Sequence, residues 1–188
     1  MAQVSRMRIL SLAGLLGLCL MVVGCARQTD LGIGSSDVKP LGVGDPAPPL
    51  NIDQWINGQP SSAGFEGGVH VVEFWATWCG PCRVSIPHIS TLQDEYGDQV
   101  TIIGVTNEDM GMVEAFLASE SPDGRPWSDV ITYHLATDNN EATNTAYMKA
   151  AGQNGIPTAF IVGRDGRIQW IGHPGRIDGP LRQAVEGS

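Results

Sequence analysis

A pair of cysteines set between a buried strand and a helix is the feature that most constrains this chain of 188 residues. Residues 69–75 are mostly β-branched, aliphatic or aromatic, a composition that predicts a buried strand. A short loop, 76–78, leads into Cys79-Gly80-Pro81-Cys82. Beyond it, apolar side chains recur at helical spacing, at Cys82, Ile86, Ile89, Leu92 and Tyr96. The sequence therefore predicts strand, loop and helix, with Cys79 at the helix start.

This placement favours a redox-active dithiol. A thiolate at a helix N-terminus faces unpaired N–H groups and the positive end of the helix dipole, which lowers its pKa. Two intervening residues let Cys82 sit one turn inside the helix, within disulfide reach of Cys79. Cys79 would then attack a partner disulfide, and Cys82 would resolve the mixed disulfide. Pro81 suits the first helical turn, where its missing N–H is not needed.

Other functions of a CxxC pair fit the sequence less well. A c-type haem site needs a histidine directly after the second cysteine, where this chain has Arg83. A structural zinc site needs two further ligands, and the sequence has no second CxxC and no paired histidines. A purely structural disulfide across four residues would add little stability through chain entropy.

The nine residues from Phe74 to Cys82 resemble the active site of thioredoxin-fold oxidoreductases. They are most similar to the membrane-anchored, extracytoplasmic thioredoxin-like proteins of the TlpA/ResA type. Further motifs agree with this resemblance, namely Pro87 within the predicted helix, Gly155-Ile156-Pro157-Thr158 before a later strand, and Val43-Gly44-Asp45-Pro46-Ala47-Pro48. The resemblance covers about residues 43–186 and implies a thioredoxin-like α/β fold, a central mixed β-sheet flanked by helices.

The resemblance also assigns roles to residues around the cysteines. It implies a cis peptide bond before Pro157, which exposes the backbone of Ile156 for pairing with an incoming substrate strand. Pro157 would pack beside Cys79, and Trp78 would shape the substrate surface. An ordinary trans proline at the start of a strand is the alternative for Pro157. No cofactor and no metal ion are expected.

Glu73 is the most informative single residue outside the cysteine pair. It lies six positions before Cys79, where thioredoxins carry a buried acid behind the active site. Inside an apolar strand, desolvation should raise the pKa of its carboxyl. Glu73 could then take the proton from Cys82 when that thiol attacks the mixed disulfide. The alternatives are that Glu73 faces outward or pairs with a nearby cation.

Residues 1–24 resemble a bacterial lipoprotein signal peptide and do not belong to the fold. Arg6 and Arg8 precede an apolar stretch that is too short for a comfortable membrane span. The stretch ends in Val22-Val23-Gly24-Cys25, and in lipoproteins the chain is cut before this cysteine, whose sulfur carries a diacylglycerol. The alternatives are an uncleaved N-terminal anchor and an ordinary signal peptide in which Cys25 is incidental.

The rest of the chain divides into a tether and one domain. Residues 25–44 lack apolar periodicity and are predicted to form a flexible tether, followed by a thioredoxin-like domain at 45–188. Residues 121–140 are predicted to be an insertion, because a minimal thioredoxin needs fewer residues there. The further expected elements are a strand at 100–105, helices around 113–117 and 141–151, a hairpin with its turn at 164–167, and a closing helix at 181–185.

These features predict an extracytoplasmic, lipid-anchored thiol–disulfide oxidoreductase that reduces protein disulfides, with cytochrome c maturation as one role that the resemblance implies. The expected partners are protein thiol or disulfide substrates, a membrane electron donor protein, and the membrane itself through Cys25. A net charge of −9 argues against binding nucleic acid through its phosphates. The alternative hypothesis is a non-enzymatic thioredoxin-fold module that binds a protein or haem.

Overall fold

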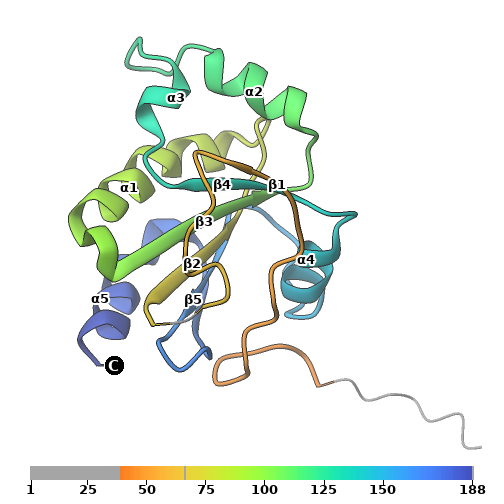
Figure 1. Ribbon diagram of the computed structural model, residues 1–188, viewed down its shortest axis with the longest axis vertical. Coiled ribbons are helices and arrows are strands. Elements are labelled where there is room, and N and C mark those ends of the chain that lie inside the picture. Colours follow the sequence, from red (N-terminus) through yellow and green to blue (C-terminus); the bar gives the residue numbers. More distant parts are fainter. Residues whose placement is uncertain (1–38, 66, 188) are drawn as a thin grey trace, which may run out of the picture. The chain divides into compact units, whose positions relative to one another are not determined.

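The computed structural model describes residues 39–65 and 67–187 (Figure 1). The predicted signal peptide at 1–24, the lipidation site Cys25 and most of the tether therefore lie outside the described residues. Among the residues that are described, none of the helices is both long and apolar enough to cross a membrane.

Six strands of the described chain form one mixed sheet, in the order β1-β4-β3-β2-β5-β6. Strands β2, β3 and β4 run parallel to one another, whereas β1, β5 and β6 each pair antiparallel with their neighbours. This confirms the predicted central mixed sheet. The strands are β1 (Ile52–Ile56), β2 (Val69–Phe74), β3 (Val100–Thr106), β4 (His134–Asp138), β5 (Thr158–Val162) and β6 (Ile168–Gly172).

Helices cover both faces of this sheet, with α1 and α5 on one side and α4 on the other (Figure 1). The α-helices are α1 (Gly80–Tyr96), α2 (Met110–Ala118), α3 (Trp127–Val130), α4 (Ala142–Asn144) and α5 (Asp178–Glu186). Shorter turns are η1 (Gly97–Gln99), the π-helical η2 (Thr145–Lys149) that continues α4, and η3 (Pro174–Arg176). Each helix expected from the sequence is present.

The alternation of side chains along β2 divides the core into two clusters. Val71 packs with Ile86 and Leu181 on the face that α1 and α5 cover, whereas Val72 packs with Tyr147 of η2 on the other face. All six residues of β2 are buried. A strand buried on both faces holds the following cysteine loop on a fixed support, since well-packed interiors deform little.

Strands β1 and β4 were not expected from the sequence. β4 lies inside the predicted insertion and fills the sheet between β3 and β1, with Trp55 opposite Ala136. Each is only five residues long, and β1 has a mixed polar composition, IDQWI. Their pairing depends on contacts between distant segments, which a short sequence pattern does not reveal.

The last residues of the predicted tether belong to the domain. The N–H of Leu41 donates to the carbonyl of Ala150 at 2.9 Å, and the N–H of Gly44 donates to the carbonyl of Ile168 at 2.7 Å. The C-terminal end of the predicted flexible segment, 25–44, is thus hydrogen-bonded to the domain. Backbone hydrogen bonding holds 41–44 although this stretch shows no strand or helix pattern.

Candidate active site

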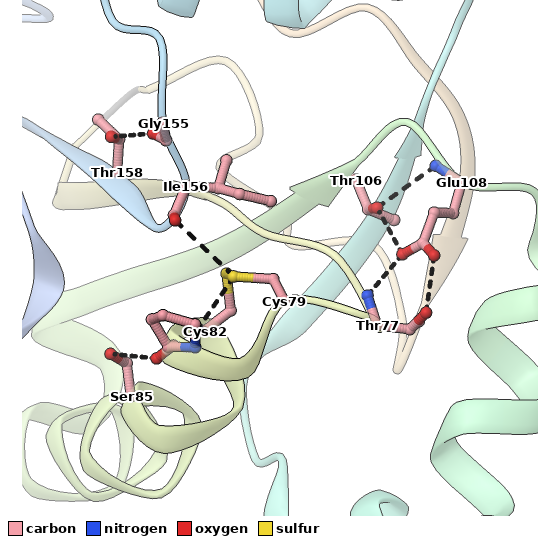
Figure 2. Close-up of a disulfide and its surroundings, with 10 residues drawn as sticks. Thr77, Cys79, Cys82, Ser85, Thr106, Glu108, Gly155, Ile156 and Thr158 are labelled. Carbon is pink, nitrogen blue, oxygen red and sulfur yellow. Dashed lines mark hydrogen bonds between the residues drawn. A yellow bond between two sulfur atoms is a disulfide. The ribbon is translucent and has the colours of Figure 1, made fainter.

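Cys79 caps the N-terminus of α1, as the sequence predicts. Its backbone is extended, and its Sγ accepts a hydrogen bond from the N–H of Cys82 at 3.2 Å. Cys79 and Cys82 form a disulfide with their Cα atoms 5.3 Å apart (Figure 2). In the reduced protein, the same N–H and the positive end of the helix dipole would stabilise a thiolate on Cys79.

The two cysteines are both buried, to slightly different extents. Cys79 keeps 4 % of its surface exposed, whereas Cys82 is completely buried. Trp78, directly before the pair, is 71 % exposed. Of the two cysteines, Cys79 is therefore the one that retains some contact with solvent, next to the exposed Trp78 ring.

The loop before β5 approaches the disulfide. The Ile156–Pro157 peptide bond is cis, as the resemblance implied, and the carbonyl oxygen of Ile156 lies 3.8 Å from Sγ of Cys79 (Figure 2). The hydroxyl of Thr158 donates to the carbonyl of Gly155 at 2.8 Å and so fixes the turn. Backbone of the Ile156 segment is therefore beside the sulfur that a substrate would reach.

Glu73 lies on β2 beneath this site, on the face of the sheet that α1 covers. It shares that face with Val71 and Trp75, because side chains alternate along a strand, and both neighbours pack in one cluster with Cys82. Glu73 has no exposed surface, and neither carboxylate oxygen has a hydrogen-bond partner among the described residues. Burial raises the pKa of Glu73 from 4.5 to about 8. Both alternatives, an outward-facing side chain and an ion pair, are thus wrong.

The glycine opposite Glu73 has no side chain and so leaves space for the neighbouring aromatic rings. Gly104 is opposite Glu73 in the β2–β3 register, and a Cβ there would lie 2.8 Å from the Leu135 side chain and 3.1 Å from the Trp75 and Tyr133 rings. Burial, reinforced by the charge of Glu73, raises the pKa of Tyr133. The carboxyl group therefore sits in an apolar, closely packed environment.

Glu108 is a residue of this site that the sequence did not indicate. Its carboxylate accepts hydrogen bonds from the N–H and the hydroxyl of Thr77 at 2.6 and 2.7 Å, and from the hydroxyl of Thr106 at 3.2 Å (Figure 2). These bonds fix the loop between β2 and Cys79. The only sequence signal was an acid placed just after a parallel strand, where loops from neighbouring strands meet.

The described residues contain no group of three or more His, Cys, Asp or Glu side chains that could hold a metal ion. The chemistry available at this site is that of the cysteine pair, with one buried acid behind it and a fixed loop in front.

Comparison with known proteins agrees with this geometry. A sequence profile described as Redoxin matches residues 42–185. This chain belongs to the Redoxin family. Its relatives include the thiol:disulfide interchange protein HelX of Rhodobacter capsulatus, which is 32% identical over 121 residues, covering 64% of this chain and 57% of HelX. The thiol-disulfide oxidoreductase ResA of Oceanobacillus iheyensis is 26% identical over 140 residues, covering 72% of this chain and 67% of ResA.

Comparison with solved structures also finds a thiol:disulfide interchange protein. The crystal structure of a thiol:disulfide interchange protein DsbE from Chlorobium tepidum superimposes with a TM-score of 0.63 at 25% identity, covering 77% of this chain and 99% of that one. The resemblance found in the sequence is therefore confirmed. The protein is a thiol–disulfide oxidoreductase with a thioredoxin-like fold.

Proposed function

We propose that this protein reduces disulfides of extracytoplasmic proteins while tethered to a membrane by lipid on Cys25. The observation that carries the catalytic part is the capping geometry of α1, where Cys79 caps the helix N-terminus and Cys82 lies fully buried one turn inside the helix. The sequence resemblance to the extracytoplasmic TlpA/ResA-type proteins and the lipoprotein-like motif ending at Cys25 support the location and the anchor.

The proposed reaction transfers two electrons from the dithiol to the substrate. The Cys79 thiolate attacks one sulfur of the substrate disulfide, and the other substrate sulfur leaves as a thiolate. Cys82 then attacks Sγ of Cys79, releasing the second substrate thiolate and forming the Cys79–Cys82 disulfide. The substrate is reduced to two thiols, and the protein is oxidised.

Glu73 is proposed to accept the proton of Cys82 in the second step. Its pKa of about 8 is close to the ordinary thiol value of about 8.5, so proton transfer between the two groups is nearly balanced in energy. E73Q should slow the release of substrate from the mixed disulfide over about pH 6–8, most strongly near pH 8, where the carboxylate that accepts the proton is most populated. Wild-type reduction rates over that range would contradict the proton-transfer role.

A reducing direction is supported by Gly80-Pro81 between the cysteines and by Ile156 before Pro157, both thioredoxin-like. The reduction potential of the full-length protein, measured by equilibration with glutathione, should lie nearer the thioredoxin value of about −270 mV than the DsbA value of about −120 mV. A potential at the DsbA end would instead indicate an oxidase.

The proposed clients are extracytoplasmic proteins such as apocytochromes c, and the proposed electron donor is a membrane protein. Replacing Cys82 with serine leaves Cys79 able to attack but removes the resolving thiol, so mixed disulfides with clients should accumulate. Identification of the proteins attached to Cys79 in cells carrying C82S tests this assignment, with C79S/C82S as the matched control. If C82S captures no more protein than the control does, the proposed function is wrong.

The lipid anchor is tested separately. Cells supplied with radiolabelled palmitate should incorporate label into the wild-type chain and not into C25S. Equal labelling of both proteins, or none of either, would overturn the proposed attachment and leave the redox assignment intact.

A further inference from the structure

A groove begins next to the cysteine pair and runs along α1. Its volume is about 550 Å³, within the range of about 300–1,000 Å³ common for ligand sites. One wall is part of α1, and the other is the segment between α2 and β4. Its lining includes Gly80, Val84, Pro87, Pro122, Trp127 and Val130.

The wall opposite α1 is held in a fixed conformation. The ring of Trp127 stacks on Phe116 with centroids 5.0 Å apart, and the N–H of Trp127 donates to the carbonyl of Ser119 at 3.0 Å. The guanidinium of Arg83 lies 5.8 Å from the centroid of the Trp127 ring and so links α1 to this wall. The groove therefore exists before anything binds, which lowers the entropy cost of binding.

The lining is mostly apolar and partly open to water. Val84 is 81 % exposed, the highest value among the large hydrophobic residues that are exposed, and Pro87 and Pro122 are exposed beside it. Asp123, also in the lining, already pairs with Arg125 at 2.8 Å. Covering this surface with an apolar side chain would remove it from water, which is favourable.

The groove is continuous with the place where a substrate must bind. Its first lining residue, Gly80, follows Cys79 directly, and Gly80, Val84 and Pro87 share one face of α1. From Gly80 to Pro87 the helix rises about 10 Å, a distance that about three residues of extended peptide would cover. A peptide joined to Cys79 by its own cysteine could thus reach along the groove.

We propose that this groove binds the extended segment flanking the attacked cysteine of a protein substrate, with a large apolar side chain about three residues from that cysteine. The inference rests on the proposed function, since it assigns a substrate preference to the same redox site. The groove selects the substrate, and Cys79 performs the first exchange.

The test compares short peptides with the full-length protein in detergent, reduced with dithiothreitol and freed from it. Each peptide has one cysteine joined to 5-thio-2-nitrobenzoate. Attack of Cys79 on the peptide sulfur releases the coloured thiolate, and Cys82 then releases the peptide. Leucine or glutamine, which are of similar size and both neutral, is placed three residues before or after the cysteine.

At one of these two positions leucine should give about tenfold faster release of the thiolate than glutamine, because burial of its side chain favours binding. In V84S/P122S, which makes the groove more polar, this ratio should fall toward 1. M112S is the matched control, since Met112 is exposed on α2 outside the groove, and it should keep the ratio.

Each other outcome overturns a defined part of the hypothesis. Equal rates for leucine and glutamine at both positions would refute the proposed binding of an apolar side chain in the groove. They would leave the assignment as an oxidoreductase unaffected. A ratio that V84S/P122S leaves unchanged would also refute the groove. Failure to release the thiolate from any peptide would overturn the proposed function, and this inference with it.

Discussion

Replacing Glu73 with glutamine should remove a pH dependence from the stability of the fold. Burial without a hydrogen-bond partner among the described residues raises the pKa of Glu73 from 4.5 to about 8. In the unfolded chain the carboxyl would titrate near the lower value. Between the two values the folded state keeps a proton that the unfolded state has released, so the free energy of unfolding falls as pH rises.

The size of this effect follows from the two pKa values. Each pH unit inside the window lowers the free energy of unfolding by about 1.4 kcal/mol, and a window of about 3.5 units gives about 5 kcal/mol. Below the window the group is protonated in both states, and above it the loss is complete. Because glutamine does not titrate, E73Q should match the wild type near about pH 4 and exceed it by about 5 kcal/mol near about pH 9.

The assay is urea unfolding of both oxidised proteins, followed by tryptophan fluorescence at intervals from about pH 4 to about pH 9. E114Q is the matched control, since Glu114 is an exposed acid on α2, and its difference from wild type should not grow with pH. If the difference between E73Q and wild type also stays constant, Glu73 does not titrate as a buried acid. The proton-transfer proposal would then lose its physical basis.

Two further predictions concern the packing and the loop of the active site. G104A should lower the free energy of unfolding by about 1–3 kcal/mol, because the new Cβ would lie 2.8 Å from the Leu135 side chain. G179A is the control, since a Cβ at Gly179 meets no atom within 4 Å. Equal urea midpoints for G104A and G179A would contradict the packing argument. E108Q should cost about 1–3 kcal/mol by weakening a charge-assisted hydrogen bond to Thr77, and it should speed hydrogen exchange at the Thr77 amide. Unchanged exchange in E108Q would show that Glu108 does not fix the loop.

Local patterns in the sequence were sufficient to predict most of the redox site. The order of strand, loop and helix around Cys79 depends on neighbouring residues, and so does the hairpin at 164–167. The buried position of Glu73 was the favoured prediction, because most residues of its strand are apolar on both faces. Each of these features involves residues within about one element of one another.

Features that depend on the pairing of distant segments were not inferable. Strand β4 is recognisable only through its pairing with β3 and β1, and Trp55 and Ala136 are opposite each other although far apart in the sequence. The hydrogen bonds that Thr77 donates to Glu108 depend on β3 lying parallel and next to β2. The groove along α1 likewise needs the position of Trp127, which its stacking on Phe116 determines.

The hydrogen bond from Gly44 to Ile168 shows at which end of the sheet the chain enters the described domain. Ile168 is opposite Val162, which is opposite His70 near the beginning of β2, whereas Cys79 follows the other end of that strand. The two ends of β2 are about 16 Å apart. The described N-terminal segment and the reactive sulfur therefore lie at opposite ends of β2, so a substrate that reaches Cys79 need not contact Gly44.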